Sequence, residues 1–132
     1  MKTIRVSAAI MHHDGMVYCT RRAYGSFKGY WEFPGGKREE GESGEDAIIR
    51  EIKEELGADI KVESLLITVE YQYPEFYLIM DCYLCSLLSE KLTLSVHDDA
   101  AWLHLSELDS VKWLPADVLA INKLKEISSS LI

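Results

Sequence analysis

The sequence predicts an α/β sandwich in which a mixed β-sheet lies between helices. β-prone segments both precede and follow one acidic helical segment, and a second, amphipathic helical segment comes after them. The 132 residues, of which 48% are hydrophobic and 27% charged, are enough to bury one core and too apolar to stay disordered. We therefore expect a single domain over residues 1–132.

The first predicted elements are strands. Residues 6–11 are apolar and β-prone, and the His-His-Asp-Gly turn at 12–15 lets residues 16–20 return as a second strand, so a hairpin is expected. Residues 31–33 form a short extended piece. The Pro-Gly-Gly triplet that follows ends it, because proline and glycine interrupt regular strands.

Residues 44–56 are predicted to form the acidic helix. Ser43 with Asp46 three residues later resembles a capping box, apolar residues recur at helical spacing, and Gly57 supplies a C-terminal cap. Further strands are expected near residues 61–71, 76–87 and 101–104, which are rich in β-branched and aromatic side chains. An apolar stripe after Pro115 predicts the last helix.

The three cysteines, Cys19, Cys82 and Cys85, are too few and odd in number for a disulfide framework. Cys82 and Cys85 form a lone CxxC within a predicted strand, where positions three apart point to opposite faces. This geometry disfavours a zinc site, so both thiols are expected in the core.

The formal net charge of −8 disfavours binding to a nucleic acid polymer or to an anionic membrane. A small phosphorylated ligand remains compatible, because a bound divalent cation reverses the local sign of the charge. No targeting segment and no apolar run near the ~20 residues of a membrane span is visible. We therefore expect a cytoplasmic protein.

Three carboxylates on the acidic helix form a candidate metal site. Glu51, Glu54 and Glu55 are spaced i, i+3 and i+4, so they leave one face of the helix. Like charges at this spacing cost about 0.2–0.5 kcal/mol per pair, and a hard cation such as Mg²⁺ relieves the repulsion. The alternative is an ordinary solvated acidic face.

The residues around these carboxylates follow a recognisable pattern. From Gly36 the chain gives five residues, Glu42, seven residues, and then Arg50-Glu51-Ile52-Lys53-Glu54-Glu55-Leu56-Gly57-Ala58. Residues 36–58 resemble the Nudix box, Gly-x5-Glu-x7-Arg-Glu-U-x-Glu-Glu-x-Gly-U with U a bulky aliphatic residue, at every position but the last, where Ala58 is smaller. The segments Trp31-Glu32-Phe33-Pro34-Gly35-Gly36-Lys37 and Leu114-Pro115-Ala116-Asp117 also look like MutT-type members, including the CTP pyrophosphohydrolase branch.

The resemblance implies a Nudix α/β/α sandwich and hydrolysis of a nucleoside triphosphate to a nucleoside monophosphate and pyrophosphate. It implies Mg²⁺, with Mn²⁺ as the alternative, held by Glu51, Glu54, Glu55 and the Gly36 carbonyl. One of these carboxylates would also act as the base for the attacking water, or orient that base. Arg50 would pair with Glu42 and hold the box in shape.

Many Nudix relatives carry another carboxylate on a later loop, as a Glu-His pair six and five residues before a strand tryptophan. Counted from Trp102, those positions here hold Val96 and His97. The expected glutamate is missing, so Asp98 or Asp99 would have to replace it. The alternative is a solvated loop.

Three residues are candidates for contact with the substrate. Phe33 stands where MutT-like enzymes stack on the base, although a core aromatic is equally expected there. Asp117 replaces an Asn of the enzyme that clears oxidised guanine nucleotides; an ionised carboxylate only accepts hydrogen bonds, which favours exocyclic amino groups such as cytosine N4. Its alternative role is a residue in the first turn of the last helix. Arg22 could reach the phosphates, and the Trp31-Glu32 pair could touch substrate.

The leading hypothesis is Mg²⁺-dependent pyrophosphohydrolysis of cytidine or modified cytidine nucleotides. The alternatives are sanitation of oxidised purine nucleotides such as 8-oxo-dGTP, hydrolysis of ADP-ribose or dinucleoside polyphosphates, and a non-catalytic nucleotide-sensing Nudix-like domain. The retained Glu51, Glu54 and Glu55 disfavour the last. The expected partner is a small nucleotide, without nucleic acid polymer or membrane, on a monomer or homodimer.

Overall fold

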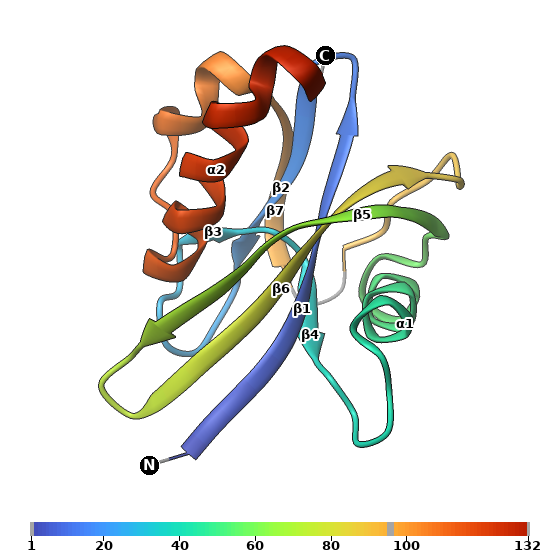
Figure 1. Cartoon of the computed structure of the whole chain (residues 1–132). Coiled ribbons are helices and arrows are strands. Elements are labelled where there is room, and N and C mark those ends of the chain that lie inside the picture. Colours follow the sequence, from blue (N-terminus) through green and yellow to red (C-terminus); the bar gives the residue numbers. More distant parts are fainter. Residues whose placement is uncertain (1, 95–96, 132) are drawn as a thin grey trace.

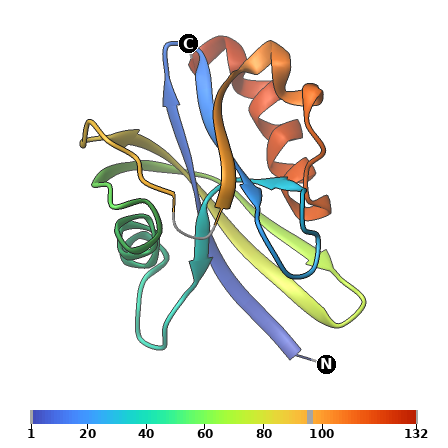
Figure 2. The ribbon, with the colours of Figure 1, turned by 180° about the vertical axis from the view of Figure 1, so that it is seen from behind.

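A computed structural model describes residues 2–94 and 97–131 of the protein. Two α-helices lie on opposite faces of a mixed sheet, which confirms the predicted fold class (Figure 1 and, from behind, Figure 2). The elements are β1 (Lys2–His13), β2 (Met16–Arg22), β3 (Trp31–Glu32), β4 (Gly35–Lys37), α1 (Gly44–Leu56), β5 (Ile60–Gln72), β6 (Phe76–Leu87), β7 (His97–His104), the 3₁₀ helix η1 (Leu105–Ser110) and α2 (Pro115–Leu131).

The sheet is built around β1. Its main path runs β3-β2-β1-β6-β5; β4 also pairs with β1, and β7 pairs with β2. β1 and β6 are parallel from Lys2↔Phe76 to Met11↔Cys85, whereas the other strand pairs are antiparallel. β4 approaches β1 so closely that a side-chain carbon on Gly35 would overlap the Ser7 carbonyl.

The expected hairpin of the first two strands forms only at its turn. β1 pairs with β2 at His12↔Val17 and His13↔Met16, and the rest of β1 lies between β6 and β4. β7 begins at His97, earlier than the sequence pattern indicates, because residues 97–104 continue the ladder along β2. The 3₁₀ helix η1 has no counterpart among the predicted elements.

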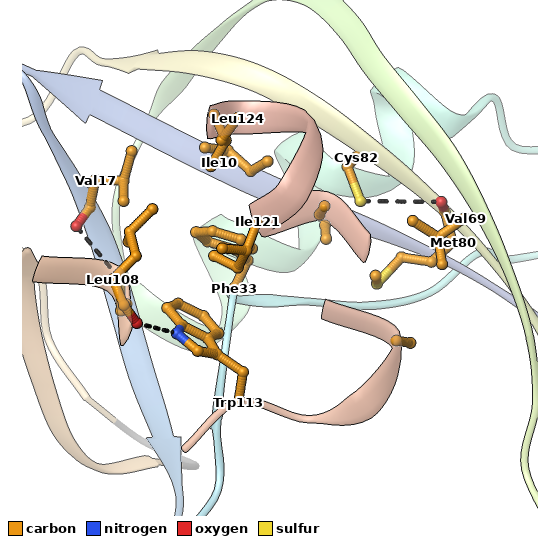
Figure 3. Packing of buried hydrophobic residues seen from close by; sticks show 14 of the residues in the cluster. Ile10, Val17, Phe33, Val69, Met80, Cys82, Leu108, Trp113, Ile121 and Leu124 are labelled. Atoms are coloured by element: carbon orange, nitrogen blue, oxygen red, sulfur yellow. Dashed lines mark hydrogen bonds between the residues drawn. The ribbon is translucent and has the colours of Figure 1, made fainter. Parts of the chain in front are cut away.

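Each face of the sheet carries its own core. The α2 side buries Ile10, Phe33, Leu108 and Leu124, and the indole N–H of Trp113 donates to the Leu108 carbonyl at 2.6 Å (Figure 3). The α1 side buries a second cluster, with Met11, Tyr18, Ile48, Ile52 and Leu56 among its members.

The cysteines of the CxxC pair separate as expected. Cys82 belongs to the α2-side cluster and Cys85 to the α1-side cluster, and both are buried free thiols. Burial raises the pKa of the Cys85 thiol to about 12, so it stays protonated. In the described ranges no helix is long and apolar enough to cross a membrane.

Helix α1 has the predicted bounds. The Ser43 hydroxyl accepts a hydrogen bond from Asp46 N–H at 3.1 Å, which caps the first turn. Gly57 ends the helix with a φ of 64° and donates its N–H to the Lys53 carbonyl at 3.1 Å. Because Ile48 and Ile52 face the core, Glu51 and Glu55, three and seven residues after Ile48, flank that face and are half-buried, whereas Glu54 is exposed.

Candidate active site

Two adjoining cavities open beside β3 and β4. The first, here the apolar cavity, has a volume of about 270 Å³; Phe33, Tyr73, Leu78, Met80 and Asp117 are among its lining residues. The second, here the acidic cavity, has a volume of about 340 Å³ and is lined by residues that include Glu55 and His97. Arg22, Glu32 and Gly35 line both. A single elongated ligand can therefore occupy the two cavities together.

Glu51 and Glu55 of α1 lie together next to β4. A side-chain carbon on Gly36 would overlap the Glu51 carboxylate, so only glycine admits this approach. Burial, the hydrogen-bond contact with Glu51 and the charge of Glu51 together raise the pKa of Glu55 to about 8. Two carboxyl groups in contact require a proton or a cation between them.

Arg50 organises the acidic residues that precede the cavity. Its guanidinium donates to both oxygens of Glu42, at 2.8 and 2.9 Å, and to the Lys37 carbonyl at 3.1 Å. It also donates to Glu51 at 2.9 Å and to Glu54 at 3.2 Å. The hydrogen bond from Arg50 lowers the pKa of Glu42 to about 2, so Glu42 stays ionised.

The three predicted metal ligands are not equally placed. Glu51 and Glu55 lie together, whereas the Glu54 carboxylate is exposed and turned to Arg50. Across residues 2–94 and 97–131, no three His, Cys, Asp or Glu side chains stand in an arrangement ready to hold a metal ion. The donor chemistry nevertheless suits a hard cation, because both carboxylate oxygens of Glu51 lie beside the half-buried Gly36 and Glu55 lies against Glu51.

Asp117 is placed by the first turn of α2 and is buried at the edge of the apolar cavity. One of its carboxyl oxygens accepts a hydrogen bond from the Phe33 backbone N–H at 2.9 Å. Burial raises the pKa of Asp117 to about 8; the Phe33 hydrogen bond lowers it and the charge of Glu32 raises it. The carboxyl group can therefore carry a proton near neutral pH and act as a donor as well as an acceptor.

Phe33 has a packing role in this arrangement. Its side chain is buried, with its ring centroid 4.9 Å from that of Trp113. Tyr73 lies across the same cavity, and its hydroxyl accepts from Ala116 N–H at 3.1 Å at the start of α2. Two hydrogen bonds thus hold the start of α2 beside the cavity. Phe33, next to β3, donates to Asp117, and Tyr73, between β5 and β6, accepts from Ala116.

Arg22 reaches the junction of the two cavities but is held by protein groups. Its Nε lies 3.2 and 3.3 Å from the two Glu32 carboxylate oxygens, and its Nη1 donates to the Ser26 carbonyl at 3.0 Å. His97 approaches the same carboxylate from β7, with 3.2 Å between Nε2 and Oε2. The sequence does not predict this contact between His97 and Glu32, because only the pairing of β3 and β7 with β2 brings the two residues together.

The candidates for a later-loop carboxylate lie elsewhere. Asp98 is exposed and accepts from Arg21 Nε at 2.7 Å, and Asp99 accepts from Ala100 N–H at 2.8 Å. Neither residue is among those lining the two cavities. Val96 lies outside the described residues.

A mixed sheet between helices, with a carboxylate-bearing helix beside paired cavities, makes this an α/β protein with a candidate site for a small ligand. The family comparison makes this specific: the chain belongs to the Nudix hydrolases, because the NUDIX domain matches residues 1–132. The chain is therefore an enzyme of that family, whose members generally use divalent metal ions such as Mg²⁺.

Individual relatives agree with this assignment. The chain is 30% identical over 129 residues to an 8-oxo-dGTP diphosphatase of Escherichia coli (strain K12), which covers 96% of this chain and all of the relative. It is 46% identical over 63 residues to the CTP pyrophosphohydrolase of the same organism, which covers 47% of each. The solution structure of the Nudix family protein MutT from methicillin-resistant Staphylococcus aureus 252 matches with a TM-score of 0.77 and 41% identity, covering 94% of this chain and 97% of that one.

Proposed function

We propose that this protein hydrolyses nucleoside triphosphates of the nucleotide pool to nucleoside monophosphate and pyrophosphate, with Mg²⁺. The observation that carries the proposal is the pair of cavities: an apolar cavity with a buried, hydrogen-bonded Asp117 adjoins an acidic cavity with Glu55. A base fits the first cavity, and phosphates with their cation fit the second.

In this proposal Glu51, Glu54 and Glu55, with the Gly36 carbonyl, hold the metal. The bound cation neutralises charge on the phosphates and increases the acidity of water. The attacking water forms a bond to the β-phosphorus, the bond to the oxygen of the leaving nucleoside monophosphate breaks, and one carboxylate of α1 takes the proton.

Arg50 and Arg22 have supporting roles in the proposal. Arg50 keeps Glu42, Glu51 and the strand-helix connection in place through charge-assisted hydrogen bonds. Arg22 donates to Glu32 at the junction of the cavities, where its guanidinium is within the reach of phosphates that enter the acidic cavity.

Two bases remain candidates, each with its own support. An oxidised purine is favoured by the relative named for 8-oxo-dGTP, which matches over nearly the whole chain, and by an Asp117 carboxyl that can also donate. A cytosine is favoured by the higher identity to the CTP enzyme over 63 residues and by Asp117 when it is ionised. The first has the broader support, so we rank 8-oxo-dGTP ahead of CTP.

The test is pyrophosphate release with Mg²⁺ from 8-oxo-dGTP, CTP, dCTP, 5-methyl-dCTP and the ordinary nucleotides. Preference for 8-oxo-dGTP or for a cytosine nucleotide identifies the base. Glu55→Gln, which keeps the shape of the side chain, should lower kcat about 100-fold or more without lowering Tm. A wild-type protein that releases pyrophosphate from none of these, or a fully active Glu55→Gln variant, would contradict the proposal.

A further inference from the structure

Glu32 lies where the two cavities meet. It lines both the apolar cavity and the acidic cavity, together with Arg22 and Gly35. Its side chain is 18% exposed, so the carboxylate can be reached from the cleft. A ligand that spans both cavities must pass this group.

The Glu32 carboxylate is held from two further strands. Arg22 on β2 lies 3.2 and 3.3 Å from its two oxygens, and His97 on β7 lies 3.2 Å from Oε2. The His97 side chain is only 3% exposed, and its Nδ1 is the buried side-chain polar atom that lacks a hydrogen-bond partner within the described ranges. Burying an unpaired polar atom costs free energy. The unpaired Nδ1 of His97 therefore destabilises the folded protein, while Nε2 of the same ring helps to hold the Glu32 carboxylate in place.

The chemistry of a carboxylate limits which part of a nucleotide can lie against it. A phosphate placed directly against Glu32 without a cation would be repelled, and the proposed function places the base in the apolar cavity, toward Asp117. The part between base and phosphates is the sugar, which is neutral and carries hydroxyl donors. An ionised carboxylate only accepts hydrogen bonds, and bonds from O–H to a carboxylate are stronger than neutral ones.

We propose that Glu32 accepts a hydrogen bond from a hydroxyl group of the nucleotide's sugar, with Arg22 and His97 as positioning residues. This inference rests on the proposed function, because it takes a nucleotide across both cavities as the substrate. It adds a specificity determinant for the sugar, separate from the base contact of Asp117.

The test compares kcat/KM for the ribo, 2′-deoxy and 2′,3′-dideoxy forms of the preferred triphosphate. For the wild type, we expect the best hydroxyl-bearing form to exceed the dideoxy form about 10- to 100-fold, the size of one charge-assisted hydrogen bond. Glu32→Gln should reduce this ratio to about threefold or less. The matched control is Glu70→Gln, which removes a carboxylate that accepts from the Tyr77 hydroxyl at 2.9 Å on the exposed β5–β6 surface; it should keep the wild-type ratio.

The role of His97 is tested through the same ratio. His97→Asn shortens the donor and should move the ratio toward that of Glu32→Gln, at a Tm at which the protein is still folded. His97→Gln, whose amide donates from a longer side chain, should restore part of the ratio. A fall in kcat/KM that is equal for all three sugars would overturn the positioning role.

Several outcomes would overturn the proposal itself. Equal rates for the ribo, 2′-deoxy and 2′,3′-dideoxy forms in the wild type would do so, as would an unchanged ratio in Glu32→Gln. An increased Mg²⁺ requirement in Glu32→Gln at an unchanged ratio would place Glu32 with the metal ligands instead.

Failure of the proposed function is a separate result. If the wild type hydrolyses no triphosphate, binding of the ribo-, deoxy- and dideoxynucleoside monophosphates is compared by NMR titration. Tighter binding of a hydroxyl-bearing form than of the dideoxy form, by the wild type but not by Glu32→Gln, supports the sugar contact. Equal binding by the wild type overturns it.

Discussion

At the scale of single residues, Arg50 and Glu55 determine how charge is distributed around the acidic cavity. Arg50 is shared among Glu42, Glu51 and Glu54, so the box is held together by one guanidinium. Lysine could not reproduce this, because an ammonium group lacks the planar fork that binds both oxygens of Glu42. Glu55, by contrast, is half-buried against Glu51, and this environment raises its pKa to about 8.

Asp117 gives a pH dependence of stability with a defined sign. Its pKa is raised to about 8, so the unfolded chain loses this proton from about pH 4, whereas the folded protein keeps it up to about pH 8. Its contribution to the free energy of unfolding is therefore fully present below pH 4 and is lost as the pH rises to 8.

The variant Asp117→Asn tests this assignment. Asparagine keeps an oxygen that can accept from Phe33 N–H but cannot ionise. We expect its stability, relative to the wild type, to increase between pH 5 and pH 8 by about 1–3 kcal/mol, the usual cost of burying a poorly solvated polar group. Urea unfolding at both pH values measures the difference. A constant difference between the two proteins would show that Asp117 ionises normally.

At the scale of the elements, helix α1 depends on its caps. It carries the candidate metal ligands, and its first turn is fixed by Ser43. Ser43→Ala removes the acceptor for Asp46 N–H and should lower the free energy of unfolding by about 1 kcal/mol, with kcat changed little. Thermal and urea unfolding check the value. Ser64→Ala, at an exposed strand position, is the control and should leave stability unchanged; an equal loss in both variants would argue against the cap.

Elements set by local chemistry could be predicted, and elements set by distant pairing could not. The bounds of α1 follow from Ser43 and Gly57, which act on neighbouring backbone groups. The hairpin expected of β1 and β2 was wrong for most of its length, because the parallel ladder from Lys2↔Phe76 onward takes β1 into the centre of the sheet.

The same distinction between local contacts and contacts from distant segments applies to the candidate site. The box pattern predicted Glu51, Glu54, Glu55 and Arg50 as site residues, because the pattern is continuous in sequence, and their roles stay a prediction. The junction of Glu32 with His97 could not be derived in advance, because it arises where β3 and β7 both pair with β2. The pairing of Glu54 with Arg50 rather than with Glu55 likewise depends on side-chain rotamers that spacing does not specify.

The whole molecule is held by cores on both faces of β1, and this strand joins them. Ile10 belongs to the α2-side cluster and Met11 to the α1-side cluster, and both side chains are fully buried. A destabilising substitution in β1 should therefore lower the stability of both helical layers together.

Ile10→Ala tests this cooperativity. It should cost about 2–5 kcal/mol, the range for removing a large aliphatic side chain from a packed core, and a single transition should be seen by far-UV circular dichroism and by tryptophan fluorescence. Leu88→Ala, at a side chain that is 65% exposed, should change stability by less than about 0.5 kcal/mol. Separate transitions for the two probes would indicate that the two layers unfold independently.

The placement of Asp117 on α2 also determines the order in which the residues of the two cavities are synthesised. The residues that line the acidic cavity extend no further along the chain than His97, whereas Asp117 and Leu114 of the apolar cavity come later. A growing polypeptide on the ribosome therefore carries the residues of the acidic cavity before Leu114 and Asp117 of the apolar cavity. Because α2 completes the core that contains Ile10 and Phe33, a chain stalled before α2 should lack a folded site, and both cavities should form together only when α2 docks.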